Sequence, residues 1–261
     1  MKNKKLFIPD INILLMREII NSLHKPEKYS HKGKNGKLMI IGGSRDYSGA
    51  PVFSILAARR FVDLLYFYPA QKGPYLINAV KSIPEAIVVY NFEKIKSVDC
   101  TLFGIGLSDA KFNYRHVIKN SKKLVIDGDG LYLVKNNIPE NSILTPHEIE
   151  FKRIFELDGT LKNVCGMAKK WNCTILKKDP RGDIISDGKK TKMIKGGNCG
   201  MTKGGTGDVL AGIVSALFCK NDAFVSACYG AHLNRKAGEG LYQKFGFNYS
   251  ASDLADNLAR V

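Results

Sequence analysis

Short apolar runs alternate with longer amphipathic stretches along most of the chain. Apolar runs bounded by turn residues are typical of strands buried in a parallel sheet, and amphipathic stretches of helical period predict helices between them. The runs that predict strands cover residues 38–41, 64–68, 86–90, 100–104, 124–127 and 174–177, with one more ending near residue 144. Because strands alternate with helices, we expect an α/β fold with a mostly parallel central sheet flanked by helices on both faces.

The helical period is clearest over residues 11–23, 49–60, 206–218 and 222–240. Pro51 stands in the first turn of the second of these helices, where its missing N–H has no helical partner to lose. Residues 183–195 instead predict a hairpin that turns at Asp187-Gly188, and Ser250 is expected to cap a terminal helix. No internal repeat or domain boundary is visible. We therefore expect a single domain over residues 1–261, with residues 1–24 as a helical extension.

Composition narrows the class of protein. The chain has 261 residues, of which 44% are apolar, enough to support a buried core and to exclude a disordered protein. No apolar run reaches the roughly 20 residues that a membrane-spanning helix needs, so a transmembrane protein is excluded. Pro9, Asp10 and Asn12 interrupt the first apolar stretch, so no signal peptide is expected. The six cysteines are scattered without zinc-type spacing, which predicts free thiols in a cytoplasmic protein.

The formal net charge of +16 attracts polyanions, and nucleic acid is the first candidate. The 40 lysines and arginines are spread along the chain, however, and no zinc-finger, homeodomain or RNP-type signature is present. Nucleic acid is therefore not the expected ligand. Nucleotides and phosphorylated cofactors are also anions that the positive net charge would attract.

A glycine-rich segment, residues 196–212, runs into the helix expected at residues 206–218. Glycines let backbone N–H groups approach an anion closely, and the positive end of a helix favours phosphate or a developing oxyanion. Asp208 stands in the first turn, where the helix dipole is expected to keep it ionised and able to accept a hydroxyl proton. The alternative is a capping Asp after a flexible turn. No Gly-Lys-Ser/Thr follows, so the segment is not a Walker A loop.

Polar residues recur after other predicted strands, where open α/β sheets bind their ligands. Asp127 and Asp129 follow one strand, and their carboxylates suit Mg²⁺ or sugar hydroxyls, with a plain polar turn as the alternative. His147 follows another strand and either contacts a ligand or caps the next helix. Gly106 closes a further strand and leaves room for a ligand. This recurrence predicts one site at the carboxyl edge of the sheet.

Taken in order, these segments resemble the ADP/ATP-dependent NAD(P)H-hydrate dehydratases of the ribokinase-like superfamily, from about residue 25 to the C-terminus. The matching pieces are Tyr47-Ser48-Gly49-Ala50, Gly104-Ile105-Gly106-Leu107, Asp127-Gly128-Asp129-Gly130-Leu131, Thr145-Pro146-His147 with Glu150, Leu176-Lys177, and residues 196–212. The resemblance implies a ribokinase-like fold and a lyase that repairs hydrated NADH and NADPH. In the implied reaction ADP or ATP phosphorylates the ring hydroxyl, and phosphate is then eliminated.

The resemblance also implies the roles of the site residues. Asp208 would take the hydroxyl proton, while Gly205, Thr206 and Gly207 would stabilise the transferring phosphoryl group. The residues implied to contact the hydrated cofactor are Ala50, Gly106, Asp127, Asp129, His147, Asn198 and Asp208. Those implied to contact the nucleotide are Lys177, Lys178, Asp183, Gly204 and Gly207. Mg²⁺ is an expected cofactor, with no residue assigned as its ligand.

Two segments depart from the family pattern. Lys178 stands where the family usually has glycine, and residues 179–182 lengthen the turn, so Asp183 is expected to replace the usual later turn residue. Residues 127–130 read Asp-Gly-Asp-Gly in place of Asp-Ala-Asp-Ala, which retains both carboxylates. The epimerase domain that often accompanies the family has no room here, so a separate epimerase is expected. The resemblance further implies a homo-oligomer.

Two other functions fit parts of the pattern. A small-molecule kinase of the same superfamily, acting on a hydroxymethylpyrimidine, a thiazole alcohol or a sugar, would share the fold and the Gly-x-Gly-Asp chemistry. The Thr-Pro-His-x-x-Glu segment and the complete glycine-rich loop favour the dehydratase. The third interpretation is a non-catalytic nucleotide- or nucleic-acid-binding descendant, motivated by Lys178 and the net charge. Its complex with nucleic acid would weaken steeply with salt.

Overall fold

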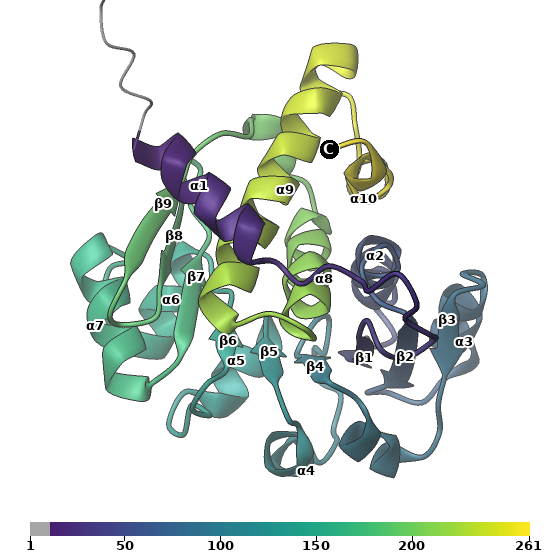
Figure 1. Ribbon diagram of the computed structural model, residues 1–261. Helices are drawn as coiled ribbons and strands as arrows, with labels where there is room; N and C mark the ends of the chain where they lie inside the picture. Colours follow the sequence, from purple (N-terminus) through teal and green to yellow (C-terminus); the bar gives the residue numbers. More distant parts are fainter. Residues whose placement is uncertain (1–10) are drawn as a thin grey trace, which may run out of the picture.

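Nine strands form one sheet in the computed structural model, which describes residues 11–261, with side chains from residue 16 onward (Figure 1). The strand order is β3-β2-β1-β4-β5-β6-β7-β8-β9, parallel from β3 to β7 and antiparallel through β8 and β9. The strands are β1 (Lys37–Gly42), β2 (Leu64–Pro69), β3 (Ala86–Val88), β4 (Cys100–Phe103), β5 (Leu124–Ile126), β6 (Ile143–Leu144), β7 (Thr174–Lys177), β8 (Asp183–Ser186) and β9 (Thr191–Ile194). The predicted mostly parallel sheet is confirmed.

Helices alternate with the strands and then close the chain. The α-helices are α1 (Ile11–Ser22), α2 (Gly49–Ala58), α3 (Pro74–Lys81), α4 (Tyr114–Asn120), α5 (Asp129–Val134), α6 (Glu148–Phe155), α7 (Leu161–Trp171), α8 (Thr206–Phe218), α9 (Ala223–Phe245) and α10 (Ala251–Asn257). Short 3₁₀ helices are η1 (Phe92–Ser97), η2 (Cys199–Thr202) and η3 (Leu258–Arg260). Figure 1 shows α1, α8 and α9 in front of the sheet.

The two faces of the sheet bury separate cores because alternate strand residues point to opposite sides. Ile40 of β1 belongs to the core cluster that includes residues of α2, α8 and α9, whereas its neighbour Ile41 belongs to the cluster that includes residues of α5, α6 and α7. A third cluster joins α8, α9 and α10, where Val209, Ile213 and Leu254 are fully buried. Burial on both faces explains why the central strands are apolar throughout.

The helix α8 is held close to α2, and this contact places the first turn of α8. Gly212 permits the approach, because a Cβ there would lie 2.4 Å from the carbonyl oxygen of Ser54. The hydroxyl of Ser54 also donates a 2.7 Å hydrogen bond to the carbonyl oxygen of Asp208. The start of α8 is therefore fixed relative to the loop after β1.

The predicted elements are found with changed ends. The strand predicted over 86–90 stops at Val88 in β3, which lies at the edge of the sheet and has a single neighbouring strand. The helix predicted to end at Gly240 continues to Phe245. Gly238 and Gly240 do not end the helix. Their role is in packing, since the absence of side chains lets Met201 and Asn257 approach the helix closely. Pro9 and Asp10, on which the signal-peptide expectation rests, lie outside the described residues. None of the described helices combines the length and apolarity needed to cross a membrane.

Candidate active site

The glycine-rich loop between β9 and α8 is an open cradle of backbone amides. Gly205 precedes α8 with φ of +93°, and a Cβ there would lie 2.5 Å from the ring of Phe53. Thr206 closes the loop by donating from its hydroxyl to the carbonyl oxygens of Met201 (2.6 Å) and Lys203 (2.9 Å). Gly204 has open space around it. The first amides of a helix lack helical partners, so this turn presents N–H groups to an anion.

Asp208 lies in the first turn of α8 and is partly buried. Burial raises its pKa to about 7; the nearby carboxylates of Asp127 and Glu150 also raise it, while Lys178 lowers it. The prediction that the helix dipole keeps Asp208 ionised is therefore wrong below about pH 7. The loss of hydration and the two like charges outweigh the helix end. A carboxyl group with this pKa can exchange a proton near neutral pH.

Lys178 brings the strand-end carboxylates together. Its Nζ lies 2.9 Å from Oδ1 of Asp127 and 3.8 Å from Oε2 of Glu150. Thr145 adds a 2.7 Å hydrogen bond from its hydroxyl to the same Asp127 oxygen. Burial lowers the pKa of Lys178, but the attraction of Asp127, Glu150 and Asp208 outweighs it and leaves the pKa raised. The cluster is therefore a buried ammonium group surrounded by carboxylates.

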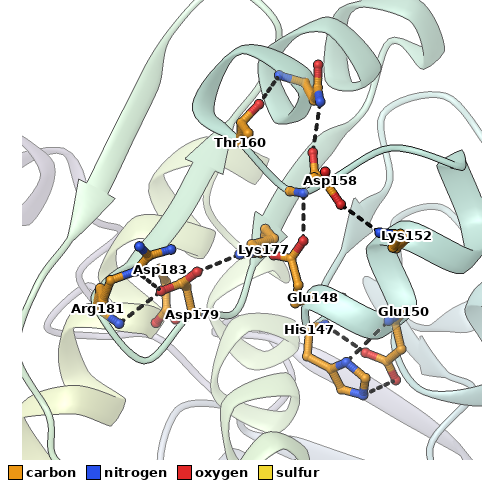
Figure 2. A network of polar contacts seen from close by, with 12 residues as sticks. His147, Glu148, Glu150, Lys152, Asp158, Thr160, Lys177, Asp179, Arg181 and Asp183 are labelled. Atoms are coloured by element: carbon orange, nitrogen blue, oxygen red, sulfur yellow. Dashed lines mark hydrogen bonds and ion pairs between the residues drawn. The ribbon is translucent and has the colours of Figure 1, made fainter.

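His147 is the N-cap of α6, and its ring belongs to the same edge of the sheet (Figure 2). Its Nδ1 accepts from the backbone N–H of Glu150 at 3.2 Å, while the Glu150 carboxylate accepts from the backbone N–H of His147 at 2.8 Å. The backbone N–H of Lys178 donates to the carbonyl oxygen of Pro146 at 2.8 Å, which sets His147 beside Lys178. The predicted cap is confirmed, and the half-exposed ring faces the pocket described below.

Lys177, which the resemblance implies to contact the nucleotide, does not line the pocket described below. Its buried Nζ forms ion pairs with Glu148 and, at 2.6 Å, with Asp179 (Figure 2). The backbone N–H of Gly159 donates to the same Glu148 at 2.8 Å. Successive residues at the end of a strand point to opposite sides, so Lys178 enters the carboxylate cluster while Lys177 is turned away from it.

The lengthened turn over residues 179–182 is held from its other side by α9. Arg235 donates from Nε and a terminal nitrogen to the Asp183 carboxylate, at 2.8 and 2.6 Å. It also donates to the carbonyl oxygens of Asp179 and Gly196. Asp183 in turn accepts from the backbone N–H of Asp179 at 3.1 Å. Asp183 therefore acts through its ion pair to fix the turn, and both of its oxygens are already engaged.

A pocket of about 340 Å³ lies between this turn, the glycine-rich loop and α9. Its walls are His147, Lys178, Asp179, Pro180, Asp183, Asn198, Cys199, Met201, Thr202, Thr206, Gly207, Leu210, Asn234 and Arg235. Asn198 lines it, but its side chain is hydrogen-bonded within the protein to Gly200, Gly238 and Tyr249. Asn234 is buried, and its Oδ1 has no hydrogen-bond partner among residues 16–261.

Sequence reasoning missed Asn234 and Arg235. Asn234 and Arg235 stand beside His232 and Lys236 in the sequence, so no local pattern separates them from polar residues that face solvent. Their position in the pocket depends on the packing of α9 against β7 and β8, which no local pattern reveals.

The remaining predicted residues lie toward the opposite end of the sheet. Gly106 has φ of +57°, and a Cβ there would lie 2.8 Å from Cβ of Ala50. These two residues are thus brought together where the loops after β1 and β4 meet. Asp129 is separate from the Lys178 cluster, because its carboxylate accepts from the backbone N–H of Ser108 at 2.8 Å. It holds the loop that follows Gly106.

The site residues do not form a cage for a metal ion. Asp127, Glu150 and Asp208 have the oxygen ligands that Mg²⁺ prefers, but the Nζ of Lys178 occupies the space between them. No group of three or more His, Cys, Asp or Glu side chains in the described part of the chain is arranged to hold a metal. The cluster's positive charge comes from the protein itself.

Comparisons with known proteins point to one family. Residues 38–260 match the family model described as NAD(P)H-hydrate dehydratase. The bifunctional NAD(P)H-hydrate repair enzyme Nnr of Methanocaldococcus jannaschii is 37% identical over 93% of this chain and 51% of its own length. The chain thus spans about half the length of that relative. The ADP-dependent (S)-NAD(P)H-hydrate dehydratase of Cenarchaeum symbiosum is 32% identical over 89% of this chain and 90% of the relative.

Solved structures give the same fold. A ribokinase-like superfamily protein from Enterococcus faecalis has a TM-score of 0.80 and 26% identity, covering 93% of this chain and 92% of its own. The ADP/ATP-dependent NAD(P)H-hydrate dehydratase of Bacillus subtilis, co-crystallised with ATP/Mg²⁺, has a TM-score of 0.81 and 23% identity, covering 94% and 95%. The predicted ribokinase-like fold is confirmed. The match over residues 38–260 shows that the chain belongs to the NAD(P)H-hydrate dehydratase family.

Proposed function

We propose that this chain is a nucleotide-dependent (S)-NAD(P)H-hydrate dehydratase, a lyase that returns hydrated NADH or NADPH to the reduced cofactor. The observation that carries the proposal is the position of Asp208, a carboxyl with a pKa of about 7, directly behind the amide cradle of α8. Because the chain belongs to the NAD(P)H-hydrate dehydratase family, we propose that Asp208 activates the hydroxyl group on a hydrated nicotinamide ring.

The first step transfers a phosphoryl group to that hydroxyl. Asp208 accepts the hydroxyl proton as the oxygen attacks the terminal phosphorus of the nucleotide, and the bond to the leaving nucleotide oxygen breaks. The backbone amides of Gly204, Gly205 and Gly207 stabilise the charge on the transferring group, while the amide of Thr206 donates to the carbonyl oxygen of Lys203 within the loop. In the second step phosphate leaves with the electron pair of its bond to the ring carbon. Loss of a proton from the adjacent ring carbon restores the double bond.

Lys178 supplies the fixed positive charge of this site. Its ammonium group is held by Asp127 at 2.9 Å and lies beside the first turn of α8, since a Cβ on Gly207 would be 3.6 Å from Nζ. This position lets Lys178 attract the incoming phosphoryl oxygens and keep Asp208 partly ionised near neutral pH.

The nucleotide is proposed to bind in the 340 Å³ pocket. The unpartnered Oδ1 of Asn234 would accept from an amino group of the base, while Gly204 and Gly207 face the phosphates. ADP is the proposed donor, because the relatives from Cenarchaeum symbiosum and Nitrosopumilus maritimus are ADP-dependent. Since the protein residues form no cage for Mg²⁺, we propose that any required Mg²⁺ is carried by the nucleotide phosphates.

A coupled absorbance assay tests the proposal. Purified protein is mixed with hydrated NADH or NADPH and Mg²⁺, with ADP and ATP in parallel and a no-nucleotide control. We expect nucleotide-dependent return of the absorbance of the reduced nicotinamide ring. Protein that binds nucleotide but restores no absorbance with either donor would contradict the proposal and favour a kinase for another alcohol.

A further inference from the structure

A second cavity, of about 350 Å³, lies at the carboxyl ends of β2 and β4, apart from the pocket beside α9. We call it the β2–β4 cavity. It is lined by Tyr68, Pro69, Ala70, Gln71, Lys72, Phe92, Lys111, Phe112 and Asn113. These residues come from the end of β2 and the loop after it, the start of η1 and the loop after β4.

The β2–β4 cavity adjoins the part of the site where Ala50 meets Gly106. The loop after β1 is tied to the cavity wall by a 2.6 Å hydrogen bond from the backbone N–H of Arg45 to Oε1 of Gln71. On the other side, the same loop that contains Gly106 continues within five residues to Lys111. Two loops therefore border both the Ala50–Gly106 contact and the cavity.

The strand order sets the distance from the reacting group to this cavity. Asp127 follows β5 and Tyr68 ends β2, and the order β2-β1-β4-β5 separates them by three strand spacings, or about 14 Å. The nucleotide pocket lies in the opposite direction, beside β7 and α9. A dinucleotide, whose two bases are joined through two riboses and a pyrophosphate, can span a distance of this order in an extended conformation.

The cavity combines aromatic walls with unpaired positive charge. Tyr68 and Phe92 stack with ring centroids 4.7 Å apart, the His116 ring stacks on Phe92 at 4.9 Å, and Phe112 from the loop after β4 also lines the cavity. Lys72 and Lys111 are exposed, and neither has an ion-pair partner within the described portion of the chain. Aromatic faces favour a planar base, and free ammonium groups favour phosphate. The chemistry suits an adenosine phosphate.

We propose that the β2–β4 cavity binds the adenosine-phosphate half of the hydrated dinucleotide, with its nicotinamide half at Asp208. This inference rests on the proposed function. The hydrated dinucleotide then lies along the carboxyl edge of the sheet from β5 to β2, and the phosphoryl donor binds on the β7 side. The two nucleotides occupy different ends of the site and do not compete.

The test uses a truncated substrate. KM is measured for hydrated NADH, hydrated NADPH and hydrated reduced nicotinamide mononucleotide, which lacks the adenosine half. The variant is the double substitution Lys72→Ala/Lys111→Ala, and the matched control is Lys162→Ala, an exposed lysine on α7. We expect the double variant to raise KM for both dinucleotides by about tenfold or more, with KM for the mononucleotide and for ADP unchanged.

A direct binding measurement separates this inference from the proposed function. The affinity for ordinary NADPH, followed by its own fluorescence, requires no turnover and should fall in the double variant alone. Equal KM changes for dinucleotide and mononucleotide, or unchanged NADPH affinity in an active double variant, would overturn the role of the cavity. Normal NADPH binding without dehydration by the wild-type protein would overturn the function instead.

Discussion

At the scale of single residues, Asp208 combines a chemical role with a cost in stability. An Asp in an unfolded chain has a pKa of about 3.9, whereas burial raises the pKa of Asp208 to about 7. Between these values the folded protein holds the proton more tightly than the unfolded chain does. The contribution of Asp208 to stability therefore falls as pH rises from about 4 to about 7 and stays low above that range.

We predict that Asp208→Asn lowers turnover by roughly 10²- to 10⁴-fold, because the general base is lost. The same substitution should raise the free energy of unfolding at pH 8 by roughly 1–4 kcal/mol, since it removes a buried charge of raised pKa. Activity assays and urea unfolding at two pH values check both effects. A stability gain as large at pH 4 as at pH 8 would contradict the electrostatic explanation.

Lys178 is expected to set the pH at which the enzyme works. Without its ammonium group, ionised Asp208 is repelled by Asp127 and Glu150 with no opposing charge, so the pKa of Asp208 rises further. We predict that Lys178→Met moves the acid limb of the kcat/KM profile upward by about one pH unit or more.

Two comparisons keep this prediction specific. Lys178→Arg retains the positive charge and should keep the acid limb near its wild-type position, while Lys162→Met changes the same charge far from the cluster. An acid limb that stays in place in Lys178→Met, despite loss of rate, would show that Lys178 acts without affecting Asp208.

At the scale of elements, the loop and helix that carry Asp208 are positioned by close backbone contacts. Gly205 has φ of +93°, and a Cβ there would lie 2.5 Å from the ring of Phe53, whereas Gly204 has open space around it and a φ outside the left-handed region. The two adjacent glycines thus have different structural roles. One permits the turn into α8, and the other leaves the amide cradle open.

This difference gives a paired prediction. Gly205→Ala should lower the free energy of unfolding by roughly 1–3 kcal/mol, because it adds backbone strain and a clash. Gly204→Ala should leave the free energy of unfolding within about 0.5 kcal/mol of wild type. Denaturant unfolding of both variants is the measurement. Equal losses of unfolding free energy in the two variants would show that the positive φ of Gly205 does not account for the effect of its substitution.

Local patterns predicted the strands, the two long C-terminal helices, the hairpin and the glycine-rich loop, because each has a period or a turn signature of its own. They did not predict which way Lys177 and Lys178 point. That choice depends on where β7 ends relative to α6 and on buried acceptors such as Glu148. The pairing of Arg235 with Asp183, 52 residues away in the chain, likewise comes from tertiary packing.

At the scale of the whole molecule, the sheet orders the proposed ligands along one edge. The nucleotide pocket lies beside β7 and α9, Asp208 lies near the middle, and the β2–β4 cavity lies beyond Gly106. The chain also spans only about half of its bifunctional relatives. We propose that the dehydratase site of this chain acts on one epimer of the hydrate, so that the other epimer must first be epimerised.

A mixture of the two epimers tests this dependence. With excess ADP, we predict that this 261-residue chain restores part of the hydrate quickly and then slows to the spontaneous rate of epimerisation. Addition of an epimerase should convert the slow phase into a fast one. Rapid and complete conversion by this chain alone would contradict the proposal that its site acts on one epimer.

The turn over residues 179–182 is fastened at both ends, by Lys177 through Asp179 and by Arg235 through Asp183. Much of its conformational entropy is therefore lost when the chain folds, so little ordering cost remains for the binding of the proposed nucleotide. A turn held in this way changes its conformation little when a ligand binds. We therefore expect the proposed nucleotide pocket to be largely formed before a nucleotide binds, and its geometry to depend on how firmly α9 packs against the sheet.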